Sequence, residues 1–338
     1  MLKHLTNLDG VSGNENAVRE FVLEQIAPYA DEVKVDTMGN VIALKKGTRG
    51  GKNKTVVCAH MDEVGLIISE ITESGFLKFK PVGGLDDRIL LTQRVRIGEN
   101  KVPGIIGVKA VHLQEPDERK RVIRQKNLYI DIGASNKGEA AALVKLGDYA
   151  AFDSDYREIG DCIKAKALDD RIGCMILLEC IRHTYAQDIY FCFTVQEETG
   201  LRGARILAHR LEADVALVLE ATTAADIPFV AEHEQCTRQG NGAAVSVMDR
   251  GSASDRALVE FITTLADRQG IRYQYKQTGF GGNDAGAFAA TGGACRTAAI
   301  SAPCRYIHSP VSTVRKSDIS DMRRLVRCTL EHLHELEG

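Results

Sequence analysis

Residues 195–204 read VQEETGLRGA and continue directly from the apolar run IYFCFTV (189–195). An apolar run of this length is typical of a buried strand, and Gly200 marks the turn into a helical pattern. Two adjacent carboxylates, Glu197 and Glu198, therefore stand where a buried strand ends. Taken alone, the pair indicates either a solvated strand end or the acidic first turn of a helix. The rest of the chain decides between these interpretations and a functional site.

Strand and helix patterns alternate on both sides of this stretch. TVVCAH (55–60) and DVALVL (214–219) are apolar runs typical of buried strands. Apolar residues recur at helical spacing over 17–26, over 258–265 and over 319–333. Ser12 and Glu15 have the spacing of a capping box before the first of these helices, and Ser254 is predicted to cap the second. The pattern predicts an α/β fold.

The segment 66–160 has a different sequence pattern. GLIISEI, GFLKFKPVGG, RVRIG and PGIIGVKA are short strand-like pieces separated by Gly and Pro, with little helical periodicity. We expect a small β-barrel-like unit inserted into the α/β domain. The predicted division is 1–65 for the first part of the α/β domain, 66–160 for the β-rich insert and 161–338 for the second part.

The overall composition excludes several classes of protein. The chain has 338 residues, is 44% hydrophobic and 26% charged, and carries a formal net charge of −3. This balance favours a globular protein and gives no general attraction to nucleic acid or to an acidic membrane. No apolar run approaches the roughly 18 to 20 residues that span a bilayer, and the start MLKHLTNLDGVSGNE lacks a signal peptide pattern, so we expect a cytoplasmic location. The nine widely spaced cysteines include no CxxC pair and are expected to be reduced.

Potential metal ligands follow the apolar strands. His60 ends TVVCAH, Glu220 follows DVALVL, and the pair at 197–198 follows the strand-like run at 189–195. Ligands of open α/β sheets bind beyond the carboxyl ends of the strands, so these side chains are expected to meet. Asp62 lies two residues after His60 and shares its side of an extended segment. A carboxylate in that position can orient a metal-bound histidine.

Two irregular segments add further donors. KAKALDDRIG places Asp169 and Asp170 at the start of a helix, and PCRYIHSP places His308 in a loop. Oxygen and nitrogen donors without thiolate suit zinc, cobalt or manganese. Several carboxylates at one point repel each other unless cations lie between them, and two ions roughly 3.5 to 4 Å apart with one bridging carboxylate resolve that repulsion. One member of the 197–198 pair can then bind metal while the other acts as a general base.

Six motifs occur in order along the chain: GVSGNE (10–15), AHMDEVG (59–65), KALDDRIG (166–173), VQEETGLRGA (195–204), GGNDAGA (281–287) and IHSP (307–310). With them the whole chain resembles the dinuclear-metal aminopeptidases that form tetrahedral dodecamers, sometimes named glutamyl aminopeptidases or endoglucanases. The resemblance implies a zinc-peptidase-like α/β domain with a mixed central sheet flanked by helices, and a dimerisation role for the insert. It also implies a homo-oligomer built from dimers, with a dodecamer as the expected particle.

The resemblance also implies roles for individual residues. Five residues would hold two divalent ions: His60, Asp169, Glu198, Glu220 and His308. The ions would be zinc or cobalt, with manganese as a further candidate. Asp169 would bridge the ions, Glu197 would be the general base, and Asp62 would orient His60. A hydroxide held by both ions would attack the first peptide carbonyl of a short peptide. No substrate-binding residue is predicted.

Glu220 departs from the family pattern and leaves alternatives open. Aminopeptidases of this kind often have Asp at that position, and Glu accompanies carboxypeptidases and deacylases in the wider clan. A metal-dependent deacylase or carboxypeptidase-like amidohydrolase is therefore the closest alternative function. A glycosidase is more distant, because the chain has no Trp for sugar stacking. The non-enzymatic alternative is a binding protein that keeps only the scaffold.

Overall fold

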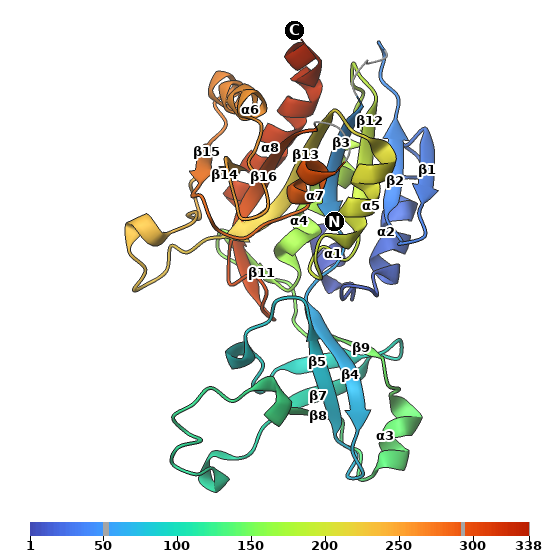
Figure 1. The fold of residues 1–338 in the computed structure, drawn as a ribbon, viewed down its shortest axis with the longest axis vertical. Helices are drawn as coiled ribbons and strands as arrows, with labels where there is room; N and C mark the ends of the chain where they lie inside the picture. Colours follow the sequence, from blue (N-terminus) through green and yellow to red (C-terminus); the bar gives the residue numbers. More distant parts are fainter. Residues whose placement is uncertain (50–53, 292–294, 338) are drawn as a thin grey trace.

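The computed structural model describes residues 1–49, 54–291 and 295–337, which form two lobes (Figure 1). The larger lobe contains an eleven-stranded mixed sheet in the order β1-β2-β12-β3-β13-β16-β17-β11-β10, with β14 paired to β16 and β15 paired to β14. Its strands are β1 (Glu32–Val35), β2 (Val41–Lys45), β3 (Thr55–His60), β10 (Arg157–Ile159), β11 (Cys162–Ala165), β12 (Ile189–Thr194), β13 (Val215–Thr223), β14 (Ala243–Ser246), β15 (Tyr273–Lys276), β16 (Arg296–Arg305) and β17 (Ser312–Arg315).

The centre of this sheet is parallel. Strands β12, β3, β13 and β16 run in the same direction, with Thr194 opposite His60 and Glu220 opposite Ser301. All six residues of β3 are buried, as expected for a strand that is covered on both faces. The carboxyl ends of the four strands consequently meet at one edge of the sheet.

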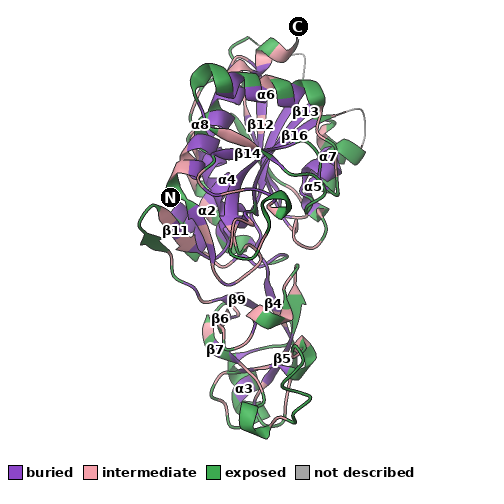
Figure 2. Cartoon of the chain, turned by 90° about the vertical axis from the view of Figure 1, so that its left-hand side faces the viewer, coloured by how far each residue is buried: buried purple, intermediate pink, exposed green. Residues whose placement is uncertain are grey.

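Helices cover both faces of the sheet, as Figure 2 shows by the buried strands between them. Alternate residues of β3 point to opposite faces: Val57 and Ala59 join one core, and Val56 and Cys58 join the other. The first core contains residues of α1 (Leu2–Asn7), α2 (Asn16–Ile26), α4 (Leu168–Cys180), α6 (Arg256–Gln269) and α8 (Lys316–His332). The second core contains residues of α5 (Arg202–Leu211) and α7 (Ala285–Ala290).

The smaller lobe is a closed barrel in the order β4-β5-β8-β7-β6-β9 (Figure 1). Its strands are β4 (Gly65–Ile71), β5 (Leu77–Val82), β6 (Arg94–Ile97), β7 (Val102–Gly107), β8 (Tyr129–Asp131) and β9 (Tyr149–Phe152), accompanied by helix α3 (Lys137–Leu143). The barrel has its own core, which includes Leu66, Phe79, Ile106 and Phe152. The predicted fold class, a mixed α/β sheet flanked by helices together with a small barrel, is confirmed.

Two predicted helix caps are wrong. Ser12 does not cap α2; its hydroxyl lies 3.1 Å from Thr199 Oγ1, and Glu15 Oε1 accepts hydrogen bonds from the amides of Gly13 and Gln196. These contacts connect the start of α2 to the segment after β12 and replace the local capping box. The N-cap of α6 is Asp255 rather than Ser254, with the Leu258 amide donating to its carboxylate.

Buried charges pack where the two lobes join. Lys166 Nζ lies 2.6 Å from Glu63 Oε1 and 3.4 Å from Asp9 Oδ1, and the side chains of Lys166 and Glu63 are 1% and 3% exposed. Arg96, on barrel strand β6, donates two hydrogen bonds to Asp9. Arg171 Nε donates to the carbonyl of Met61, which lies between the two lobes in the chain. The buried cations at this junction, Lys166 and Arg171, therefore both have partners.

None of the helices in the described ranges is long and apolar enough to cross a membrane. The nine cysteines are all unpaired, as the sequence predicted.

Candidate metal centre

His60, the last residue of β3, is the central residue of the first group of potential metal ligands. Its imidazole is buried, and Nε2 lies 3.2 Å from both Asp169 Oδ1 and Glu220 Oε1. Glu220 belongs to β13, whose parallel pairing to β3 brings both strand ends to the same edge. His60, Asp169 and Glu220 each offer a ligand atom, and these three atoms all lie within 4.8 Å of one another.

Asp169 belongs to this first group and also to a second one. It lies in the non-helical beginning of α4, where the peptide bond to Asp170 is cis. Its second oxygen, Oδ2, lies 3.5 Å from His308 Nε2, and the same nitrogen lies 3.4 Å from Glu198 Oε2. Ligand atoms of Asp169, Glu198 and His308 are again within 4.8 Å of one another. One carboxylate thus faces two potential ion positions.

His308 reaches this group from the loop after β16, with a backbone in the left-handed region at φ 54°. Its Nδ1 lies 3.2 Å from the carbonyl oxygen of Gly84, in the segment that follows barrel strand β5. A carbonyl at that nitrogen favours the tautomer with the proton on Nδ1, which leaves Nε2 free to bind a metal. The barrel lobe therefore contributes directly to the orientation of a predicted ligand.

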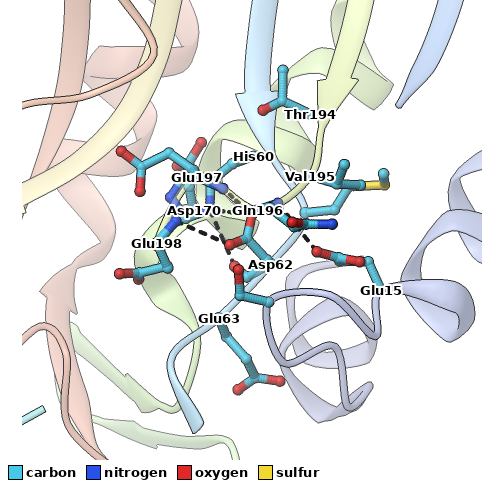
Figure 3. A network of polar contacts seen from close by, with 12 residues as sticks. Glu15, His60, Asp62, Glu63, Asp170, Thr194, Val195, Gln196, Glu197 and Glu198 are labelled. Atoms are coloured by element: carbon cyan, nitrogen blue, oxygen red, sulfur yellow. Dashed lines mark hydrogen bonds and ion pairs between the residues drawn. The ribbon is translucent and has the colours of Figure 1, made fainter. Parts of the chain in front are cut away.

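Asp62 has a larger structural role than the sequence suggested. Its Oδ1 lies 3.4 Å from His60 Nδ1, while the His60 ring also approaches the Asp62 carbonyl at 3.1 Å. The same carboxylate accepts hydrogen bonds from the amides of Glu197, at 3.0 Å, and Glu198, at 3.1 Å (Figure 3). This fully buried side chain fixes the backbone of the glutamate pair relative to His60.

The pKa values of the site residues are shifted because several carboxylates are buried close together. Burial raises the pKa of Glu198 to about 7, with Asp169 adding to the shift and His308 opposing it. Burial also raises the pKa of Glu220 well above its usual range, and the charge of Asp169 adds to this. Burial lowers the pKa of His308, but the hydrogen bond to Asp169 and the charge of Glu198 outweigh it and raise the value to about 9. These raised pKa values reflect the cost of placing several negative charges close together, and a divalent cation can relieve that repulsion.

The donor set fits divalent cations. Five imidazole and carboxylate donors converge from the end of β3, the interior of β13, two segments that follow strands and the start of helix α4, and a single carboxylate is shared by both groups. Borderline metals such as zinc take nitrogen and oxygen donors of these kinds. Every residue that the sequence analysis named as a ligand lies in one of the two groups, although the roles of the individual residues stay a prediction.

A cavity of about 350 Å³ opens beside the first group. Glu197 lines this cavity together with His60, Asp169, Glu220 and His308. Burial raises the pKa of Glu197 well above its usual range; His60 opposes the shift, and Asp284 and Glu198 add to it. Glu197 is therefore the member of the pair that faces the space for a substrate, whereas Glu198 faces His308.

Two further buried acids lie near the site, and the sequence analysis gave neither of them a catalytic or metal-binding role. Asp284, within the GGNDAGA motif, accepts a hydrogen bond of 2.6 Å from the hydroxyl of Thr194 at the end of β12, and burial raises its pKa to about 6. Asp170 is fully buried, and the Gly173 amide donates to its Oδ1. The motif's first glycines, Gly281 and Gly282, line the cavity. The signal that could have found Asp284 is its acidic side chain in an otherwise small and uncharged motif.

Comparisons with known proteins find relatives over nearly the whole chain. The sequence model of the M42 glutamyl aminopeptidase family matches residues 39–325. A putative aminopeptidase of Acetivibrio thermocellus is 40% identical over 328 residues, which are 96% of each chain. Lysyl aminopeptidase of Pyrococcus furiosus is 31% identical over 346 residues, with 100% of this chain and 98% of the relative covered. A structure of the TET1 peptidase of Pyrococcus horikoshii, which can assemble into a tetrahedron or a large octahedral shell, is 34% identical with a TM-score of 0.87, covering 97% of this chain and 98% of that one.

Proposed function

The chain belongs to the M42 glutamyl aminopeptidase family and is a metal-dependent aminopeptidase, and we propose that it uses two divalent ions and Glu197 to remove N-terminal residues from short peptides. His60, Asp169 and Glu220 would hold one ion, and Asp169, Glu198 and His308 the other. The observation that carries the proposal is the position of Asp169, whose two oxygens face the two groups separately.

When bound, the ions would polarise the scissile carbonyl and lower the pKa of water. The chain's own residues handle the proton. Glu197 lines the cavity and can take a proton from the attacking water and deliver it to the nitrogen of the leaving peptide. Burial raises the pKa of Glu197 above its usual range, which makes its carboxylate a stronger proton acceptor. Asp62 accepts hydrogen bonds from the amides of Glu197 and Glu198 and so fixes the positions from which the two carboxylates perform their different roles.

Substitution of the two glutamates tests this division. Glu197→Gln is expected to retain both ions and to lose about 100- to 10,000-fold in kcat, the usual range for removing a general base. Glu198→Gln is expected to lose metal as well as activity. Metal per chain is measured by elemental analysis, and activity with aminoacyl-anilides. Glu24→Gln, an exposed glutamate of α2, is the control. Full activity of Glu197→Gln would disprove the assignment of the base.

The identity of the ions needs a separate measurement. We propose zinc or cobalt, with manganese as a further candidate, because the donors are imidazole and carboxylate without thiolate. Metal-free protein reconstituted with each ion should bind about two per chain and recover activity. Binding of a single ion would contradict the second group.

The deacylase alternative rests on Glu220. Comparison of the same aminoacyl-anilide with a free and with an acetylated amine separates the two functions. An aminopeptidase cleaves the free form, and preference for the acetylated form would support the alternative.

We also propose that residues 66–160 form a dimerisation domain and that the dimers assemble into a dodecamer. The surface of the barrel lobe exposes large apolar side chains, which are typical of interaction sites: Ile105, Val111, Leu113, Val122, Leu143 and Leu146. Leu146 is 64% exposed, so Leu146→Asp should dissociate the dimer without unfolding the chain. Val35→Asp on the edge strand β1 is the control. Sedimentation of the unmodified chain as a monomer at micromolar concentration would refute the proposal.

A further inference from the structure

Glu15 is a buried acid whose carboxylate reaches the segment that carries the glutamate pair. It stands at the start of α2 and is 3% exposed. Its Oε1 accepts a hydrogen bond of 2.7 Å from the amide of Gly13, two residues earlier, and one of 3.1 Å from the amide of Gln196, 181 residues later (Figure 3). Within the described chain, the side chain makes no capping bond to the first turn of α2. The carboxylate therefore serves the contact between α2 and the end of β12.

Gln196 has a demanding backbone conformation directly before the proposed base. Its φ is 55°, in the left-handed region, which a residue with a Cβ adopts when the surrounding contacts hold it there. Glu197 is the next residue, so the turn at Gln196 sets the direction in which the chain presents that carboxylate. The amide of Gln196 is held by Glu15.

Glu15 and Asp62 together hold three successive amides of this segment. Glu15 accepts from Gln196, and Asp62 accepts from Glu197 at 3.0 Å and from Glu198 at 3.1 Å. Both acids are buried, and neither is among the described residues that line the cavity. The backbone of the glutamate pair is thus fixed at consecutive points by side chains from two distant segments. Hydrogen bonds to a carboxylate are stronger than those to a neutral acceptor, which suits this supporting task.

The loop that carries Glu15 is itself fixed to the rest of the structure. The hydroxyl of Ser12 lies 3.1 Å from Thr199 Oγ1, after the glutamate pair. Gly13 has a φ of 93°, and a Cβ at this position would lie 2.8 Å from the hydroxyl oxygen of Tyr149, on barrel strand β9. Because the loop packs between the barrel and the segment after β12, it can act as a rigid support for that segment.

We propose that Glu15 is a positioning residue for the general base Glu197. Its hydrogen bond keeps the turn at Gln196 in the conformation from which the Glu197 carboxylate faces the cavity. Glu15 acts through the backbone and contacts neither the substrate nor a candidate ligand in this role. A reacting group that is misplaced by about 1 Å can cost roughly 100-fold in rate, so this support should matter to kcat. The proposal rests on the proposed function of Glu197 and adds a residue on which the reaction depends.

Substitutions that keep or remove the acceptor oxygen test this role in the metal-loaded enzyme. Glu15→Gln keeps an oxygen in the place of Oε1, and its kcat with leucine p-nitroanilide is expected to stay within about threefold of the unmodified enzyme. Glu15→Met has a similar length but no such acceptor, and should lower kcat by about 10- to 100-fold while KM changes by less than about threefold. Both variants should keep the metal content of the unmodified enzyme by elemental analysis, because the amides that Glu15 holds belong to residues that are not candidate ligands. An equal loss of kcat in the two variants would overturn the proposal.

A double-mutant cycle with Glu197→Gln separates positioning of the base from a general loss of structure. If Glu15 acts through Glu197, Glu15→Met should change the residual kcat of Glu197→Gln by less than about twofold, because the base that it positions is already absent. A general loss of structure would lower kcat by the same factor in both backgrounds, and that result would overturn the proposal. If Glu15→Met does not fold, Glu15→Asp takes its place in the cycle with the same expectations, since it keeps the charge and shortens the reach.

Asp318→Asn is the matched control. Asp318 is fully buried, and its carboxylate accepts hydrogen bonds from the amides of Gly240, at 2.7 Å, and Gly242, at 3.1 Å. The variant weakens a buried support of the same kind and should lower the midpoint of urea unfolding, while kcat stays within about twofold. A loss of kcat in Asp318→Asn as large as that in Glu15→Met would overturn the specific role of Glu15.

The same measurements distinguish this proposal from the proposed function. If Glu197→Gln loses activity while Glu15→Met is fully active, the role of Glu15 is refuted and Glu197 remains the base. If Glu197→Gln is fully active, the assignment of the base is wrong, and the role of Glu15 is refuted with it.

Discussion

Replacement of Asp62 by asparagine tests how the two halves of the metal centre are connected. The carboxylate accepts from the amides of Glu197 and Glu198 with separate oxygens and also contacts His60. Asparagine keeps one acceptor and presents a donor in place of the other, so one amide loses its partner inside the protein. Hydrogen bonds to charged groups contribute about 1.5–3 kcal/mol each, and we expect Asp62→Asn to lower the free energy of unfolding by that amount.

The effect on activity should exceed the effect on folding. Because the glutamate pair moves when its backbone support is lost, metal affinity and kcat/KM are each expected to fall by about 10- to 100-fold. Metal binding is measured by competition with a chelator, kcat/KM with an aminoacyl-anilide, and stability by urea unfolding.

Asp36 offers a matched control away from the site. Its side chain is 1% exposed, and its Oδ1 accepts from the amides of Met38, Gly39 and Asn40. Asp36→Asn should lose similar stability and keep metal affinity and kcat/KM. If Asp62→Asn retains metal affinity and kcat/KM within about twofold, the inferred connection through Asp62 is wrong.

Three further outcomes are expected. Glu63→Gln, which removes the nearer of the two anionic partners of the buried Lys166, should lower the free energy of unfolding by up to about 3–5 kcal/mol in urea titration, and an unchanged midpoint would contradict the importance of the pair. Asp9→Asn should destabilise the protein at pH 7 but not well below pH 3.8. Burial raises the pKa of the Asp9 carboxyl, but the charge of Lys166 and the hydrogen bond from Arg96 outweigh burial and lower the pKa overall. The carboxylate therefore stabilises the fold above the pKa of the unfolded state, and this stabilisation is lost as the pH falls through the lower pKa of the folded state. Removal of metal by a chelator should abolish activity and lower the melting temperature, because bound ions stabilise only the folded chain. Re-addition of zinc or cobalt should reverse both effects. A metal-free protein with full activity would contradict a metal centre.

Much of the fold could be predicted because the buried strands are local features. The apolar runs that end at His60 and Thr194 match the ends of β3 and β12, so the residues beside these ends follow from the sequence. The third run was predicted to end at Leu219, but β13 continues through Glu220 to Thr223. The predicted cap of α2 was wrong for a non-local reason, because Glu15 accepts a hydrogen bond from the amide of Gln196, which is distant in the chain. In the other case, two adjacent residues, Ser254 and Asp255, both have side chains suited to capping.

The remainder depends on contacts that no local pattern encodes. The order of the eleven strands decides that β15 lies beside β14, and only this placement brings Lys276 into a cavity with residues of β13. The contact of His308 with the Gly84 carbonyl likewise joins segments that are 224 residues apart. The sequence shows which side chains can bind or donate, and the tertiary structure decides which of them meet.

The contact between Gly84 and His308 has a mechanical consequence. Nδ1 of His308, a candidate ligand, contacts the Gly84 carbonyl, which follows barrel strand β5. A Cβ on the neighbouring Gly83 would lie 3.5 Å from Glu198 Oε2. Any tilt of the barrel relative to the large lobe would thus shift the second ion position while leaving His60 and Glu220, which are held by the sheet, in place. Forces applied to the barrel by a neighbouring subunit would therefore act first on His308 and Glu198.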